Sequence, residues 1–241
     1  MKYEKVIEAK FLERPNRFIA RVNINDREET VHVKNTGRCR ELLIPGATVF
    51  LNEFSGGSRK TKYDLVAVLK ETEDGKQKLI NIDSQAPNEA VGEWLPKSGL
   101  FSENAKIRRE VSFGISRFDF AVTEESSGAS GEEKKEKTTF VEVKGVTLES
   151  GGRVMFPDAP TERGAKHLRE LSRLRREGYG AIVIFVVQMN GAVGFLPNSN
   201  TDKAFAEALF EARKSGVEIL VYDCFTAPDE MTINQPIKLL F

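Results

Sequence analysis

The chain has 241 residues, 40% of them hydrophobic and 30% charged, which is the composition of an ordinary globular protein rather than a disordered or membrane one. Its 36 basic residues balance its 36 acidic residues, so the chain as a whole is not a basic nucleic-acid binder. No apolar run approaches the roughly 18 residues of a spanning helix, the N-terminus has no secretory pattern, and Cys39 and Cys224 lack metal-ligand spacing. We therefore expect a cytoplasmic protein that does not bind membranes.

The first part of the chain, residues 1–82, predicts a small β-barrel. Short apolar or alternating runs are separated by turn sequences such as "IPG" and "EDGKQ". Five or six short strands in about 80 residues fit the OB-fold, a barrel that often binds nucleic acid. The clearest runs are "RFIARVNI", "ETVHVKN", "ATVFLNEF", "DLVAVLKET" and "KLINID".

The second part, residues 83–241, predicts an α/β domain with a mixed sheet. A helix at 87–101 precedes three strand-like runs, and the clearest helix, "APTERGAKHLRELSRLRREG", repeats leucine every three residues. A fully apolar strand, "AIVIFVVQ", a helix at 200–216 and the strand "VEILVYDCF" follow. The charged low-complexity segment 124–137 is expected to be a mobile hairpin tip without a catalytic task.

Two neighbouring strands of this domain carry charged residues where a buried strand seldom does. In "FVEVKG", Glu142 and Lys144 point to one side and the valines to the other, because side chains alternate along a strand. Asp119 in "RFDF" joins them if the two strands pair as a hairpin. Two carboxylates suit Mg²⁺ or Mn²⁺, and a nearby ammonium can assist an attacking water. This combination indicates a metal-dependent nuclease.

Basic residues gather at a few points of the sequence. The helix that begins near Asp158 places Arg163, Lys166 and His167 near its start, and their spacing sets them opposite the leucine face, where an anion would bind. The run "KIRR" at 106–109 is also basic, and "KNTGRCREL" is interpreted equally well as a plain turn or as a polyanion contact. The predicted nucleic-acid-binding residues are Lys34, Arg38, Arg108, Arg109, Arg163, Lys166 and His167.

Each pattern also has a plainer interpretation. A Glu-x-Lys pair is commonly a ladder of opposite charges on an exposed strand, and a basic helix stripe is commonly a solvated face. His167 alone is equally typical of a surface histidine without a role. The occurrence of all three features on consecutive elements favours a site.

Together, "NTGRCRELLIPGATVFL", "RFDF", "FVEVKGVTL", "FPDAPTERGAKHLREL" and "GVEIL" resemble the sugar fermentation stimulation protein A (SfsA) family, over about residues 11–235. The resemblance implies an OB-fold domain joined to a PD-(D/E)xK restriction-endonuclease-like domain. It also implies DNA binding without sequence preference and a proposed regulatory link to maltose metabolism. By motif position, Asp119 resembles the first acid, Glu142 the second and Lys144 the lysine. Phe118 replaces the motif's proline.

Two hypotheses follow. In the first, the protein is a nuclease acting on DNA, or alternatively RNA, with Asp119 and Glu142 as metal ligands and Lys144 assisting the attacking water. Arg163 and His167 would then assist at the phosphate. In the second, the protein is a non-catalytic DNA-binding regulator that retains the nuclease-like fold. The sequence leaves open the natural substrate, the mode of cleavage and the oligomeric state, a homodimer included.

Overall fold

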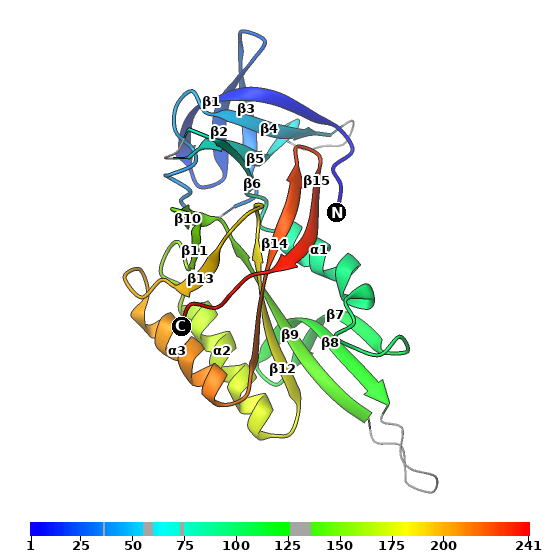
Figure 1. Ribbon diagram of the computed structural model, residues 1–241. Helices are drawn as coiled ribbons and strands as arrows, with labels where there is room; N and C mark the ends of the chain where they lie inside the picture. Colours follow the sequence, from blue (N-terminus) through cyan, green and yellow to red (C-terminus); the bar gives the residue numbers. More distant parts are fainter. Residues whose placement is uncertain (36, 55–59, 73–74, 126–135) are drawn as a thin grey trace, which may run out of the picture.

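The computed structural model describes residues 1–35, 37–54, 60–72, 75–125 and 136–241. A barrel formed by the N-terminal strands lies above an α/β domain formed by the rest of the chain (Figure 1). Most of the predicted hairpin tip at 124–137 lies outside the described residues. Among the helices of the described part, none has the length and apolar character needed to cross a membrane.

The N-terminal domain is a closed barrel, as the sequence predicts. Its strands follow the order β3-β2-β1-β4-β5-β6, and β3 also pairs with β5, which closes the ring over five strands. The first strand along the chain, β1, is not one of the clear apolar runs of the sequence, because its charged residues alternate with the buried Ala9 and Phe11. The strands are β1 (Val6–Asn16), β2 (Ile19–Ile24), β3 (Arg27–Val33), β4 (Thr48–Glu53), β5 (Tyr63–Glu71) and β6 (Gln77–Asn81).

The C-terminal domain is built on a mixed sheet of order β15-β14-β12-β9-β8-β7, which confirms the predicted fold class. The central strand β12 runs parallel to both β9 and β14, while the remaining neighbours are antiparallel. Its strands are β7 (Lys106–Phe113), β8 (Ser116–Glu125), β9 (Glu136–Val146), β12 (Gly180–Val187), β14 (Glu218–Ala227) and β15 (Glu230–Pro236).

Helices cover both faces of this sheet. Leucines of α2 and apolar residues of α3 pack with Val183 and Phe185 of β12, whereas α1 packs on the opposite face with Ile182 and Ile184. This two-sided burial explains why β12 is apolar throughout. Every residue of that strand is buried. The helices are α1 (Ala86–Trp94), followed by the short 3-10 helix η1 (Leu95–Lys97), α2 (Glu162–Arg176) and α3 (Lys203–Lys214).

A small second sheet of order β10-β11-β13 lies beside the main one, below the barrel (Figure 1). The sequence did not predict it, because its strands have only three or four residues and too few side chains to show a period. The strands are β10 (Leu148–Ser150), β11 (Arg153–Phe156) and β13 (Gly194–Pro197).

An ion pair joins the two domains at this small sheet. Glu149 of β10 is 5% exposed and accepts hydrogen bonds from Lys70 Nζ of β5 at 2.8 Å and from the Gly152 amide at 2.7 Å. Burial alone would raise the pKa of Glu149, but the Lys70 and Gly152 hydrogen bonds outweigh it and hold the pKa below its usual value. The ionised carboxylate therefore stabilises the junction.

We expect Glu149→Gln to lower the free energy of unfolding by about 1–3 kcal/mol at pH 7, because Lys70 loses its charged partner. A carboxyl with a lowered folded pKa stabilises the fold above its unfolded pKa of about 4.3, and this contribution is lost as the pH falls through the folded pKa. Urea unfolding at pH 7 and below pH 4 measures both effects. The exposed Glu71→Gln is the control, and a difference that persists undiminished in acid would contradict the account.

Candidate functional site

The regular backbone pairing of β8 with β9 ends just before Asp119 is reached. The ladder runs from Glu125↔Glu136 to Phe120↔Val141 and stops there. In place of a further backbone pair, Asp119 Oδ2 accepts a hydrogen bond from the Val143 amide at 2.7 Å. The strands thus separate locally, and a carboxylate lies in the space between them.

Glu142 and Lys144 lie on the same face of β9, as the alternation predicts. Lys144 Nζ donates to Glu142 Oε1 at 2.5 Å, and His167 Nδ1 of α2 bonds to the same oxygen. The side chain of Glu142 is 4% exposed and that of Lys144 is 15% exposed. The second oxygen of Glu142, Oε2, is buried and has no hydrogen-bond partner among the described residues. A buried carboxylate oxygen without a partner is costly unless a cation or water satisfies it.

The two carboxylates have opposite electrostatic environments. Burial, followed by the charge of Glu142, raises the pKa of Asp119, although the Val143 amide, Lys144 and Asn88 oppose the shift. Burial also disfavours the charged form of Glu142, but the His167 hydrogen bond and the Lys144 charge outweigh it and lower its pKa. The β8–β9 ladder ends at Phe120↔Val141, so its next position sets Asp119 level with Glu142 on the neighbouring strand, where the negative charge of Glu142 disfavours ionisation of Asp119.

Asp119 also opens towards solvent. Its Oδ1 accepts a hydrogen bond from Asn88 Nδ2 of α1 at 2.8 Å, and the side chain borders a hollow of about 230 Å³. Polar residues from α1, β7 and the turn before α1 make up most of the lining: Ser84, Gln85, Asn88, Glu89, Arg109, Glu110 and Asp119, with Phe120.

The donor set fits a small hard cation. Glu142 offers a free buried oxygen, and each Asp119 oxygen still has a lone pair beyond its one protein hydrogen bond. The described residues contain no group of three or more acidic, histidine or cysteine side chains arranged around a metal. Mg²⁺ and Mn²⁺ tolerate this, because such ions keep several waters and use one or two carboxylates together with substrate phosphates.

His167 lies elsewhere than the sequence indicated. The prediction that it faces away from the leucines is wrong: the residue is 7% exposed and lies on the buried face of α2 with Leu168 and Leu171. Its position follows from helix geometry, since Leu171 is four residues further on and therefore shares a face with it. His167 thus contacts Glu142, and its hydrogen bond holds that carboxylate in place.

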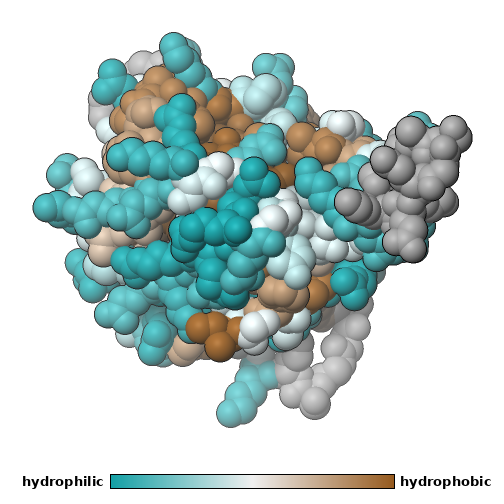
Figure 2. All heavy atoms as spheres, turned by 90° about the horizontal axis from the view of Figure 1, so that it is seen from below, coloured by the Kyte–Doolittle hydropathy of each residue, from teal (hydrophilic) through white to brown (hydrophobic). Residues whose placement is uncertain are grey.

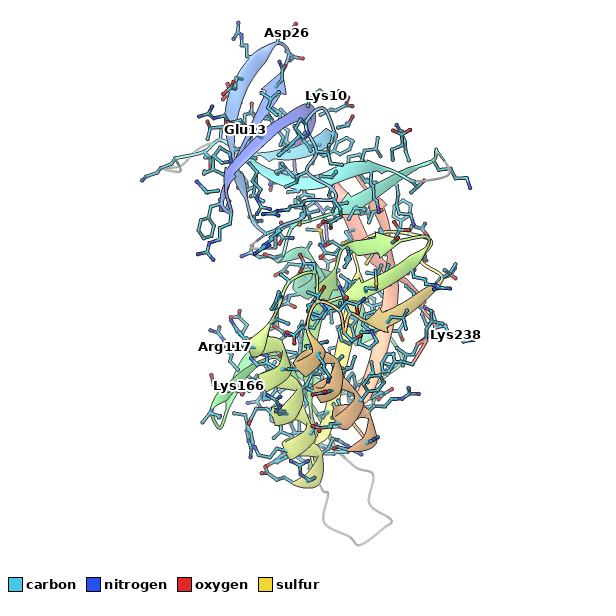
Figure 3. The ribbon with its side chains drawn as sticks, turned by 90° about the vertical axis from the view of Figure 1, so that its left-hand side faces the viewer. Lys10, Glu13, Asp26, Arg117, Lys166 and Lys238 are labelled. Atoms are coloured by element: carbon cyan, nitrogen blue, oxygen red, sulfur yellow. The ribbon has the colours of Figure 1, made fainter. Side chains whose placement is uncertain are left out.

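Two other predicted residues of α2, Arg163 and Lys166, are exposed. Lys166 points outward on the same side of the molecule as Arg117 of β8 (Figure 3). Seen from below, this end of the C-terminal domain is mostly hydrophilic, with small hydrophobic areas (Figure 2). A hollow of about 460 Å³ between α2 and α3 is bordered by Arg169, Arg176 and Lys214.

The remaining predicted contacts divide into two kinds. Lys34 is 21% exposed and pairs with Asp83 at 2.8 Å at the domain junction, which leaves little of its charge for a phosphate. Arg109 pairs with Glu89 at 2.7 Å and lies over the Phe120 ring, at the rim of the hollow. Arg38 and Arg108 are exposed. The exposed arginines can therefore reach a phosphate from solvent, whereas Lys34 is held by Asp83 at the domain junction.

Asn88 is the residue that sequence reasoning missed. It lies in the first turn of α1, a helix whose sequence shows only an apolar face, and nothing in the pattern links it to a strand thirty-one residues later. Only the packing of α1 against the sheet brings it to Asp119.

Comparison with known proteins gives concordant results over both domains. Residues 12–82 match the family described as SfsA N-terminal OB domain, and residues 85–230 match the family described as sugar fermentation stimulation protein RE domain. A sugar fermentation stimulation protein homolog from Desulfitobacterium hafniense is 52% identical over 231 residues, covering 96% of this chain and 94% of the relative.

A second such homolog, from Clostridium beijerinckii, is 48% identical over 240 residues and covers 100% of both chains. Among solved structures, that of Pyrococcus furiosus SfsA in complex with Ca²⁺ matches with a TM-score of 0.83 at 30% identity, over 100% of this chain and 98% of the other.

Proposed function

Since the chain belongs to the sugar fermentation stimulation protein (SfsA) family, we propose that it is a Mg²⁺- or Mn²⁺-dependent phosphodiesterase that cleaves nucleic acid, DNA in the first place, without strong sequence preference. The observation that carries the proposal is Glu142 Oε2, which is buried without a hydrogen-bond partner among the described residues, on a side chain that bonds Lys144 and lies level with Asp119 in the strand register. The solved relative from Pyrococcus furiosus is described in complex with Ca²⁺, which supports a divalent cation.

Each residue of such a site would have its own role. When bound, the metal would polarise the phosphodiester and lower the pKa of a coordinated water. Asp119 and Glu142 would hold it, the first fixed by Asn88 and the Val143 amide, the second by His167. Lys144, already bonded to Glu142, has further N–H groups with which to orient the attacking water and stabilise negative charge at the phosphate.

Binding would depend on a local patch, because the whole chain carries no net charge. The exposed Arg163 and Lys166 of α2 and Arg108 of β7 flank the strands that carry the carboxylates. Contacts from such side chains go to phosphates and carry no sequence information, which agrees with the proposed lack of preference. The barrel would hold the strand, as OB-folds commonly do.

A second function is a candidate on one observation: Glu142 already forms an ion pair with Lys144 and a hydrogen bond with His167, so the charge of this carboxylate is compensated without a metal. On this reading the protein is a non-catalytic DNA-binding regulator. The name of its relatives points to sugar fermentation, and a regulatory link to maltose metabolism is compatible with either activity.

A cleavage assay distinguishes the two functions. Purified protein is incubated with labelled single- and double-stranded DNA and RNA in Mg²⁺, Mn²⁺ or chelator. We expect cleavage in both metals and none in chelator. Binding of DNA without cleavage of any of the four substrates would overturn the enzyme proposal and favour the regulator.

A further inference from the structure

The barrel presents a basic surface with an exposed aromatic ring on the side of the loop that follows β3. Arg17, Arg38 and Arg40 are exposed, and the structure pairs none of the three with a carboxylate in the part of the chain it describes. Phe18 is 48% exposed, and the Arg17 guanidinium lies 5.2 Å from the centre of its ring. We call Arg17, Phe18, Arg38 and Arg40 the arginine surface.

A fourth arginine organises this surface from within. The Arg14 guanidinium donates hydrogen bonds to the carbonyl oxygens of Arg17 at 2.7 Å, Gly37 at 2.8 Å and Arg38 at 2.8 Å. It also donates to the Asn35 carbonyl at 2.6 Å. Because Arg14 turns these carbonyls inward, the two chain segments are held together while the side chains of Arg17 and Arg38 point out. The result is a shallow hollow of about 280 Å³, bordered by Arg14, Asn16, Arg17, Gly37, Arg38, Arg40 and Leu43.

The loop of the arginine surface contacts two segments of the C-terminal domain that lead to the candidate site. A Cβ added to Gly37 would lie 2.6 Å from Asp158 Oδ2, so the loop backbone packs against the segment that leads into α2. On the other side, the Ser84 hydroxyl donates to the Lys34 carbonyl, and Ser84 borders the same hollow as Asp119. The loop therefore contacts both the segment that precedes α2 and Ser84, at the edge of the hollow that Asp119 borders.

We propose that the arginine surface binds a single-stranded segment of nucleic acid and leads it to Asp119 and Glu142. This inference rests on the proposed function. Unpaired arginines fit successive phosphates, because their forked donors match phosphate oxygens. An exposed phenyl ring fits an unstacked base, and bases are free to stack on protein only where the strand is single. A duplex would offer this surface its backbone alone and would leave Phe18 without a partner.

The test measures binding of the full-length protein in chelator, where no cleavage occurs, by fluorescence anisotropy with a labelled thirty-nucleotide oligothymidine and a duplex of equal length. We expect tighter binding of the single strand. Arg38→Ala/Arg40→Ala should raise its Kd about tenfold. The double variant should also reduce the slope of log K against log salt by about 1.4, since each phosphate contributes about 0.7. Phe18→Ala should raise Kd roughly fivefold or more, and Phe18→Trp should restore binding.

Arg27→Ala/Lys238→Ala is the matched control, because it removes two exposed positive charges elsewhere, with Lys238 on the opposite side of the molecule from Lys166 (Figure 3). Its Kd should change less than twofold. Equal losses in the two double variants, or duplex binding as tight as single-strand binding, would overturn the inference. Cleavage that survives in Arg38→Ala/Arg40→Ala with unchanged Kd would refute the arginine surface but leave the nuclease intact. If the wild type binds the single strand but never cleaves it, and Arg38→Ala/Arg40→Ala loses that binding, the arginine surface would be supported and the nuclease refuted.

Discussion

Asp119→Asn and Lys144→Ala are each expected to reduce metal-dependent cleavage by at least about 10²-fold, the usual loss when one electrostatic or proton-transfer group is removed from an active site. Asparagine can still accept the hydrogen bond of the Val143 amide through its one carbonyl oxygen, and its NH2 group can donate to Asn88 once that side-chain amide turns over, but the charge that would hold the cation is lost. Lys144→Ala leaves both carboxylates in place and removes the ammonium. Single-turnover rates on one labelled substrate measure both effects.

The affinity of these two variants for nucleic acid separates catalysis from binding. Without metal, Asp119→Asn should bind as well as the wild type or better, because one negative charge facing the phosphates is gone. Glu110→Gln is the control, because Glu110 is exposed, borders the same hollow as Asp119 and pairs with Arg117 on the surface. This substitution should change the cleavage rate less than threefold. Full cleavage by Asp119→Asn would remove that residue from the mechanism.

The second large effect is on stability. Phe185 of β12 is fully buried and lies within 4.5–6.4 Å, between ring centres, of Phe156, Phe195 and Phe205. It stands opposite Lys144 in the β9–β12 register, so this aromatic cluster supports the strand that carries the site. Phe185→Ala should lower the free energy of unfolding by about 3–5 kcal/mol, from lost burial and the cavity left behind.

Calorimetry tests this with Phe210→Ala as the matched control. Phe210 of α3 is 42% exposed, so the same truncation should cost less than about 1 kcal/mol. In a chain of this size the Phe185 variant should melt roughly 6–20 °C below the wild type. Similar melting temperatures for the two variants would show that the aromatic cluster does not support the sheet.

The sequence predicts well those features that depend only on the spacing of residues within one strand or helix. Glu142 and Lys144 share a face because strand side chains alternate, whatever the rest of the fold does. The leucine repeat predicts α2 in the same local way, and the continuous apolar run predicts the buried strand β12. The barrel followed from the number and spacing of its short strands.

What the sequence misses depends on tertiary packing. Asn88 reaches Asp119, and Lys34 reaches Asp83, only because separate elements meet in the folded chain. The three-residue repeat of leucine predicts a narrow apolar stripe that leaves His167 on the solvent side, whereas the buried face of α2 is wide enough to include it. No local pattern marks the orphaned oxygen of Glu142, since its burial needs the strands, α2 and Lys144 together.

The most direct test of the shared-cation site is a crystal of the protein soaked in Mn²⁺ and measured for anomalous scattering. We predict one strong peak within about 2.5 Å of carboxylate oxygens of both Asp119 and Glu142, close to the distances at which such ions bind oxygen. A peak bound by only one of the two carboxylates, or density at neither in a fully soaked crystal, would contradict the account.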